Sequence, residues 1–357
     1  MSFEPYVRIA RHAGVNAPDA LVGALRTLDD ETARVTWMMR YHHLAAPVLA
    51  TIDEAGMRAS VDAAVMSAIE RARGNQPPAR ELLTAFDEIR RAFSARGVDL
   101  VLLKGMYLAN RLYHGYHRRP QYDLDVLVRA RSRATARRTL EGLGFRKETA
   151  DLHSQTFTRG HLKIDVHGWL RRAPAYRLDE ESIWRGVRIE RLEGFDVPTL
   201  SDEYTLVLFA LSCFEDLGQG MTKLKQLVDV YLWLRDVDAS TNWSEFFAQR
   251  ARERVDGIVA AVLAIVVALF DARDEVPRLS TALARYEKAV STTREEALAL
   301  VSAPRKHPAN LAWFGRVYPG SFWHYLTRFW WAGFPQNLKG LRADRVRATL
   351  RAAGRHG

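Results

Sequence analysis

The chain has 357 residues, more than one hydrophobic core usually organises, so two or three packed units are expected. Its 48% hydrophobic and 26% charged residues are typical of a globular protein and exclude disordered, fibrous and collagen-like chains. Lys and Arg number 52 against 42 Asp and Glu, and this net charge of +10 favours an anionic partner such as a nucleotide, a nucleic acid or a lipid surface. The net charge alone does not distinguish among these three kinds of partner.

Helical spacing of apolar residues dominates the first third of the chain and predicts an N-terminal helical region over residues 1–80. Residues 81–200 change to short β-branched runs, with strands expected at 101–103, 124–128 and 162–166 and helices at 106–113 and 132–143. Helical spacing of apolar residues returns after Ser201, which is a candidate helix cap. This spacing predicts a C-terminal helical domain over residues 201–357. The expected fold class is α+β, mostly helical overall.

The cysteine count and the lengths of the apolar stretches indicate the cellular compartment. Cys213 is the sole cysteine, which excludes an internal disulfide and a cysteine-based zinc site and fits a reducing, cytoplasmic setting. The first residues lack the pattern of a secretory signal. The apolar stretch 258–270 is shorter than the roughly 20 residues that span a bilayer, so it predicts a buried core helix. We therefore expect a cytoplasmic protein without a transmembrane segment.

Two carboxylates mark the start of the strand expected at 124–128. Residues two apart in a strand point to the same face, so Asp123 and Asp125 project together while Leu124 and Val126 enter the core. Like charges held side by side are unfavourable unless they are neutralised, and hard oxygen ligands suit magnesium or manganese. For Asp-x-Asp alone, a solvated pair at a strand edge is the usual alternative.

A third carboxylate favours a metal site over a solvated pair. Asp165 lies in the strand expected at 162–166 and shares a face with Lys163 and His167. Three carboxylates on adjacent strands can hold two metal ions for phosphoryl chemistry. Lys104 and Gly105 lie between an expected strand and an expected helix and would form the phosphate-binding end of the site. Glycine lets the backbone approach a phosphate closely, and a helix N-terminus offers free amides.

These motifs together resemble the uncharacterised nucleotidyltransferases of the DNA polymerase beta superfamily, over roughly residues 82 to 234. The marks of the resemblance are the Leu103-Lys104-Gly105 turn, the Arg119-Pro-Gln-Tyr-Asp123-Leu-Asp125 run, the helix exit at 140–145, the Ile164-Asp165-Val-His167 strand and the helix with Lys223, Lys225 and Asp229. In fold, the resemblance implies a polymerase-beta-like core with a small mixed sheet, flanked by N-terminal helices and a C-terminal helical domain.

The resemblance also implies roles for these residues. Asp123 and Asp125 would be paired ligands of Mg²⁺ or Mn²⁺, with Asp165 as the third carboxylate, which orients or deprotonates an acceptor hydroxyl. Lys104 and Gly105 would lie under the triphosphate of an NTP. The implied activity is metal-dependent transfer of NMP to a hydroxyl or phosphate of a small-molecule, peptide or protein acceptor, with release of pyrophosphate.

Further residues are assigned less directly. Arg119 is placed to reach a phosphate or to brace a carboxylate, unless it is an exposed residue of a basic run. Lys225 is preferred over Lys223 for the nucleotide, because positions two apart on a helix diverge by about 200° and Lys225 shares a face with Asp229. His167 and Lys223 are assigned to the acceptor side. Met106 stands where many family members carry serine or glycine, so Lys104 would replace a hydroxyl at the phosphates.

The sequence is also compatible with other functions. The +10 charge favours a polynucleotide acceptor such as RNA, and a non-catalytic nucleotide-binding or interaction protein that keeps the fold is a second alternative. The aromatic residues of segment 311–334 and the basic tail after Lys339 would form a surface for lipid, peptide or nucleic acid, or else a core helix followed by a solvated tail. Peripheral membrane contact is one such use.

Overall fold

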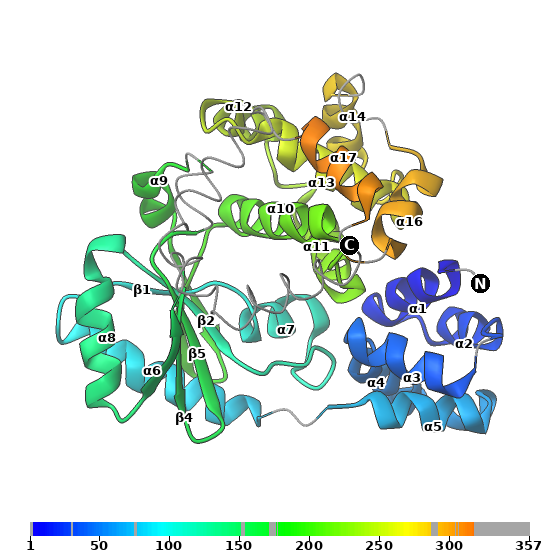
Figure 1. The fold of residues 1–357 in the computed structure, drawn as a ribbon, viewed down its shortest axis with the longest axis horizontal. Helices are drawn as coiled ribbons and strands as arrows, with labels where there is room; N and C mark the ends of the chain where they lie inside the picture. The colour runs from blue at the N-terminus through cyan, green and yellow to red at the C-terminus, as the bar shows by residue number, and fades with distance from the viewer. Residues whose placement is uncertain are drawn as a thin grey trace, which may run out of the picture.

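The structure, a computed structural model, describes residues 3–29, 31–74, 77–150, 154–170, 176, 178–286, 292–303, 305 and 307–317. Five short helices form the N-terminal part and gather beside the C-terminal helices (Figure 1). They are α1 (Glu4–Gly14), α2 (Pro18–Arg26), α3 (Thr32–Tyr41), α4 (Ala45–Glu54) and α5 (Ala63–Ala72), with a 3-10 turn at Arg58–Ser60. Helix α5 begins at an Asp62 cap, whose side chain accepts hydrogen bonds from two backbone amides.

The strands form one mixed sheet of seven strands, in the order β3-β4-β5-β2-β1-β7-β6. Strand β2 runs parallel to β5 and antiparallel to β1, whereas β1 runs parallel to β7. The strands are β1 (Leu100–Leu102), β2 (Leu124–Val128), β3 (Arg146–Ala150), β4 (Ser154–Arg159), β5 (Leu162–His167), β6 (Arg188–Leu192) and β7 (Phe195–Thr199). The expected fold class, a mixed sheet among many helices, is confirmed.

The sheet is larger than the three strands that the sequence predicts. Those three are β1 and β2, in which every residue is buried, and β5, in which buried aliphatic residues alternate with partly buried polar ones. Strand β6 has one buried residue, Leu192, among charged neighbours, and β4 has one, Phe157. Strands that bury so few residues give no apolar run, so hydropathy alone does not reveal them.

Helices cover the sheet and connect it to the site. Helices α6 (Ala79–Ser94) and α8 (Arg133–Gly142) pack together on one side of the sheet (Figure 1). Helix α7 (Met106–Tyr113) follows β1 and packs on α11 (Leu224–Val237). The apolar stripe of α6 is fully buried, so this helix belongs to the sheet's core rather than to the N-terminal bundle.

The C-terminal helices form the other wall of the site. Ser201 caps α10, as the sequence predicts, by accepting the Tyr204 amide. The apolar stretch 258–270 forms the buried helix α13, which confirms a core role. Besides α11, the C-terminal helices are α10 (Asp202–Gln219), α12 (Trp243–Arg252), α13 (Asp256–Leu269), α14 (Pro277–Leu283), α16 (Arg294–Ser302) and α17 (Pro308–Val317), with a 3-10 turn at Ala284–Tyr286. Earlier in the chain, a 3-10 turn at Ala130–Ser132 precedes α8, and α9 (Glu180–Arg185) precedes β6.

The start of the aromatic segment packs inside the helical domain. Trp313 and Phe314 are buried against Phe214 of α10, with ring centroids 5.5 and 4.4 Å away. Residues 318–334 and the basic tail lie outside the described residues. Within the ranges that the structure describes, no helix has both the length and the apolar character needed to cross a bilayer.

Candidate active site

Two neighbouring strands bring the predicted carboxylates together. Asp125 on β2 is the direct register partner of Asp165 on β5, and Asp123 immediately precedes β2. Alternation along β5 places Ile164 and Val166 in the core and leaves Asp165 half-buried on the opposite face. The three carboxylates therefore converge at one place, as the sequence predicts.

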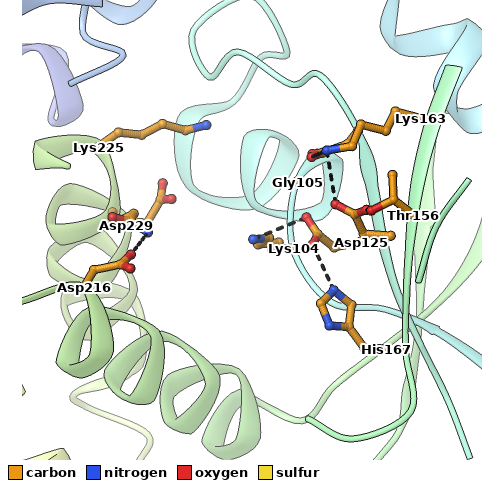
Figure 2. Close-up of polar contacts among 12 residues, drawn as sticks. Lys104, Gly105, Asp125, Thr156, Lys163, His167, Asp216, Lys225 and Asp229 are labelled. Carbon is orange, nitrogen blue, oxygen red and sulfur yellow. Dashed lines mark hydrogen bonds and ion pairs between the residues drawn. The ribbon is translucent and has the colours of Figure 1, made fainter. Parts of the chain in front are cut away.

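Lysine ammonium groups neutralise these carboxylates in the structure. Lys104 Nζ lies 3.3 Å from Asp125 Oδ2, while Lys163 Nζ lies 3.6 Å from Asp123 Oδ2 and 3.4 Å from Asp165 Oδ2 (Figure 2). Within the described ranges, no group of three or more His, Cys, Asp and Glu side chains is arranged to hold a metal ion. The metal roles of the three aspartates therefore stay predictions.

The chemistry of the donor set nevertheless fits a divalent cation. Burial and, second, the charge of Asp125 raise the pKa of Asp123. Burial alone would raise the pKa of Asp125, but Lys104 and the His167 ring outweigh it and hold that pKa well below its ordinary value. The three aspartates thus offer closely spaced carboxylate oxygens, which are the ligands that magnesium and manganese prefer.

Two further side chains contact the carboxylates. The Nε2 atom of His167, the residue assigned to the acceptor side, lies 3.2 Å from Asp125 Oδ1. Thr156 Oγ1, on β4, donates to Asp165 Oδ1 at 2.5 Å. Sequence reasoning missed Thr156, because its role depends on the β4–β5 hairpin, which pairs Thr156 directly with Asp165.

The Lys-Gly turn is built for close approach. Gly105 has φ +86° and ψ −119°, a backbone conformation open only to glycine. A Cβ there would lie 2.5 Å from Gln121 Oε1, so a side chain would collide as well. Helix α7 begins directly after this turn, which places its positive dipole end at Gly105.

Arg119 is held in an ion pair at the edge of the site. Its Nε and Nη2 lie 2.9 and 2.7 Å from the two carboxylate oxygens of Asp229, and Nη1 donates to the Gly105 carbonyl at 3.1 Å. Tyr113 donates a further hydrogen bond to Asp229 at 2.8 Å. Both ion-pair side chains are only 6% exposed. Of the two roles expected for Arg119, the geometry shows the bracing of a carboxylate.

The two lysines of α11 are arranged differently from the expectation. Lys223 is the extended residue before the helix, so Lys223 and Lys225 are not two positions of one helical wheel, and both line the same pocket. Lys225 Nζ donates to the Pro120 carbonyl at 2.9 Å. Burial, followed by the charge of Arg119, lowers the pKa of Lys225 to about 7.

Several of these groups line a pocket of about 330 Å³. The turn and strand side contributes Lys104, Gly105, Arg119, Pro120, Gln121, Tyr122, Asp123 and Asp125. The helical side contributes Leu208, Phe209, Ser212, Cys213, Lys223, Lys225, Gln226 and Asp229, and His43 completes the lining. Figure 2 shows Lys225 extending from the helical side toward the carboxylates. Asp165 is not among the lining residues and lies one strand further out.

The comparison with protein families identifies the chain. Residues 29–271 match the family described as "Uncharacterised nucleotidyltransferase". The chain belongs to this family. No curated protein matches it. Among solved structures, it is similar to an antigenic nucleotidyltransferase-like protein from Paracoccidioides brasiliensis, at 16% identity and a TM-score of 0.36, over 58% of this chain and 93% of that one.

Proposed function

We propose that this nucleotidyltransferase transfers NMP from an NTP to a hydroxyl or phosphate of a small-molecule, peptide or protein acceptor and releases pyrophosphate. The observation that carries the proposal is the direct pairing of Asp125 with Asp165 beside a pocket that holds Lys104 and Lys225. Oxygen ligands for a cation and ammonium groups for a triphosphate are the two parts that phosphoryl transfer requires.

The cation would be Mg²⁺ or Mn²⁺, held by Asp123, Asp125 and Asp165. When bound, it would lower the pKa of the attacking hydroxyl and stabilise the charge that develops on the phosphates. The ammonium groups of Lys104 and Lys163, which now neutralise these carboxylates, would then be free for phosphate oxygens.

Asp165 would receive the proton of the acceptor. The acceptor oxygen forms a bond to the α-phosphorus, the bond from that phosphorus to the bridging oxygen breaks, and pyrophosphate leaves with the electron pair. Thr156 donates to Oδ1 of Asp165 and fixes the carboxylate plane, so that Oδ2 is the oxygen that takes the proton. Lys104 and Lys225 would hold the triphosphate as it becomes the leaving group.

The pocket favours a small acceptor over a polynucleotide. Its volume of about 330 Å³ is within the range of small-molecule sites, and buried side chains of α10 close one side. The lysines here that contribute to the net charge line one pocket rather than an extended groove. Positive charge gathered in this way suits a triphosphate better than a polynucleotide.

The reaction is tested by following the α-phosphate. We would incubate the protein with Mg²⁺ and each of four α-labelled NTPs, alone and with a panel of sugar phosphates, hydroxy acids and hydroxyl-bearing peptides. Because water competes as acceptor, the proposal expects slow release of NMP and pyrophosphate even without an acceptor, and faster labelling of one compound class. Release of NDP and phosphate, or no product with any NTP, would refute it.

A further inference from the structure

The N-terminal helices hold the start of α11, where the pocket residues Lys223 and Lys225 lie. His42 and His43 form the junction between α3 and α4, and α1 also packs on α11 (Figure 1). His42 Nδ1 accepts the Leu224 amide at 3.1 Å, and the His42 carbonyl accepts the Lys225 amide at 3.3 Å. Two of the amides that begin α11 are therefore satisfied by the N-terminal unit rather than left for a ligand.

His43 contacts a pocket lysine directly. Lys223 Nζ lies 3.0 Å from His43 Nε2. An ammonium group only donates, so Nε2 must be an acceptor, which requires a neutral ring with its proton on Nδ1. Burial, then the charges of Lys223 and Lys225, lower the pKa of His43 to about 4, so the ring is neutral near pH 7. The titratable and charged groups around this ring are Lys223, Lys225, Arg119, Tyr122 and His42.

The backbone at His43 is held in an uncommon conformation. Its φ is +55°, in the left-handed region that non-glycine residues seldom adopt. This conformation ends α3: the His43 amide donates to the Arg40 carbonyl at 3.2 Å and the Leu44 amide to the Met39 carbonyl at 2.9 Å, the pattern of a left-handed helix C-terminal cap. At this position the conformation places the imidazole in the pocket lining beside Lys223.

We propose that His43 is a positioning residue of the nucleotide site, which fixes the Lys223 ammonium toward the triphosphate and makes the N-terminal helices part of that site. This inference rests on the proposed function, because it takes the pocket's ligand to be an NTP. It moves Lys223 from the acceptor side to the phosphate side. The residue does not touch reacting atoms; it acts through Lys223.

The test uses a matched pair of substitutions. Asparagine tolerates the left-handed backbone but is too short to reach Lys223, so His43→Asn removes the acceptor without adding strain. His43→Gln restores an acceptor oxygen near the position of Nε2. We expect His43→Asn to weaken binding of a non-hydrolysable NTP with Mg²⁺ about tenfold, measured by calorimetry, and His43→Gln to recover most of that loss. In turnover, KM should rise while kcat changes little.

A double-mutant cycle with Lys223→Met shows whether the two residues act together. If His43 acts through Lys223, His43→Asn has little further effect on NTP affinity in the Lys223→Met background. Nitrogen chemical shifts of the His43 ring give a readout without nucleotide: they should report a proton on Nδ1, and Lys223→Met should raise the pKa of the ring.

The outcomes separate this inference from the proposed function. Wild-type protein that binds no NTP would refute the proposed function itself. Wild-type protein that binds NTP, with His43→Asn binding equally well or with additive losses in the cycle, would overturn the role of His43 alone. A ring that carries its proton on Nε2 would also overturn it.

Discussion

Asp125 and Asp165 lie directly opposite each other on the parallel strands β2 and β5, and the site depends on this register. A shift of one residue would turn Asp165 into the core and Ile164 toward the pocket. The register is fixed by burial, because Ile164 is fully buried and pairs with the fully buried Phe157 of β4. Hydrophobic packing on one face of the sheet thereby sets carboxylate geometry on the other.

The first prediction concerns these two carboxylates. Asp125→Asn and Asp165→Asn each keep the side-chain shape but remove a charge, so turnover should fall by about a thousandfold through lost charge stabilisation and, for Asp165, lost proton transfer. Steady-state pyrophosphate release measures it. Asp196→Asn, at an exposed position of β7, is the control. Turnover within a fewfold of wild type in either variant would contradict the assignment.

Lys163 tests whether ammonium groups compete with a cation for the same oxygens. Its Nζ lies 3.6 and 3.4 Å from Asp123 and Asp165. Lys163→Met leaves those carboxylates without this neutralising charge, so the protein without nucleotide should bind Mn²⁺ about tenfold more tightly. Electron paramagnetic resonance counts free Mn²⁺, and Lys147→Met at an exposed β3 position is the matched control. Unchanged or weaker Mn²⁺ binding by Lys163→Met alone would disprove the competition.

Lys225 should make nucleotide binding depend on pH. Its pKa is about 7 in the free protein, and a bound triphosphate would raise it, so affinity is fully present below pH 7 and declines as pH rises toward the pKa of the complex. Lys225→Arg keeps its charge throughout this window. Calorimetric affinities from roughly pH 6 to pH 9 should therefore fall more steeply for wild type than for Lys225→Arg. Parallel pH curves would argue against this role.

The charged and titratable groups that affect Lys225 do not change this expectation. They are Arg119, Asp229, Lys104 and Asp123, with Lys223 in the same pocket lining. The terminal phosphate of the nucleotide also titrates near neutral pH, but it does so equally for both proteins. Comparison with Lys225→Arg therefore isolates the lysine.

Gly105→Ala should damage the phosphate turn without removing any charged group. The φ of +86° strains alanine, and its Cβ would lie 2.5 Å from Gln121 Oε1. We expect about 1 to 3 kcal/mol of lost stability and weaker NTP binding. Gln121→Ala combined with Gly105→Ala should relieve the collision but not the backbone strain. Chemical denaturation measures the stability, and a fully stable single variant would refute this account of the turn.

The Arg119–Asp229 pair should matter for stability more than for chemistry. Asp229→Ala leaves a buried guanidinium without its partner and should cost about 3 to 5 kcal/mol. Burial raises the pKa of Asp229, but Arg119 outweighs it and lowers that pKa overall. The pair's stabilisation is therefore present above the unfolded pKa and is lost as pH falls through the folded one. Urea denaturation at neutral and acid pH checks both statements; a loss below 1 kcal/mol at neutral pH would contradict them.

The sequence predicts the strands that carry the carboxylates well, because their signals are local. The apolar run 124–128 alternates with Asp123 and Asp125, and the same alternation identifies Asp165. Thr156 and His43 give no comparable signal, since each acquires its role from a contact with a distant segment. Strand β6 was missed because an edge strand with mostly exposed residues lacks an apolar run.

The roles of the basic residues could not be separated by sequence reasoning. The sequence is equally compatible with Arg119 as a phosphate ligand and as an ion-pair partner of a carboxylate. The position of Asp229 in the fold decides between these two roles. Lys223 and Lys225 diverge on an ideal helix, but the helix begins after Lys223, so both reach one pocket. Helix boundaries shift by a residue or two in sequence reasoning, and here one residue changes which charges converge.

The central claim is that the carboxylates and the lysines form one site for a metal-bound triphosphate. Calorimetric titration of a non-hydrolysable NTP into the protein, with and without Mg²⁺, tests it most directly because no acceptor is needed. We expect Mg²⁺ to tighten binding of the NTP by about tenfold or more in the wild type, and this gain to disappear in Asp125→Asn. Equal NTP affinity with and without Mg²⁺ in the wild type would contradict the account.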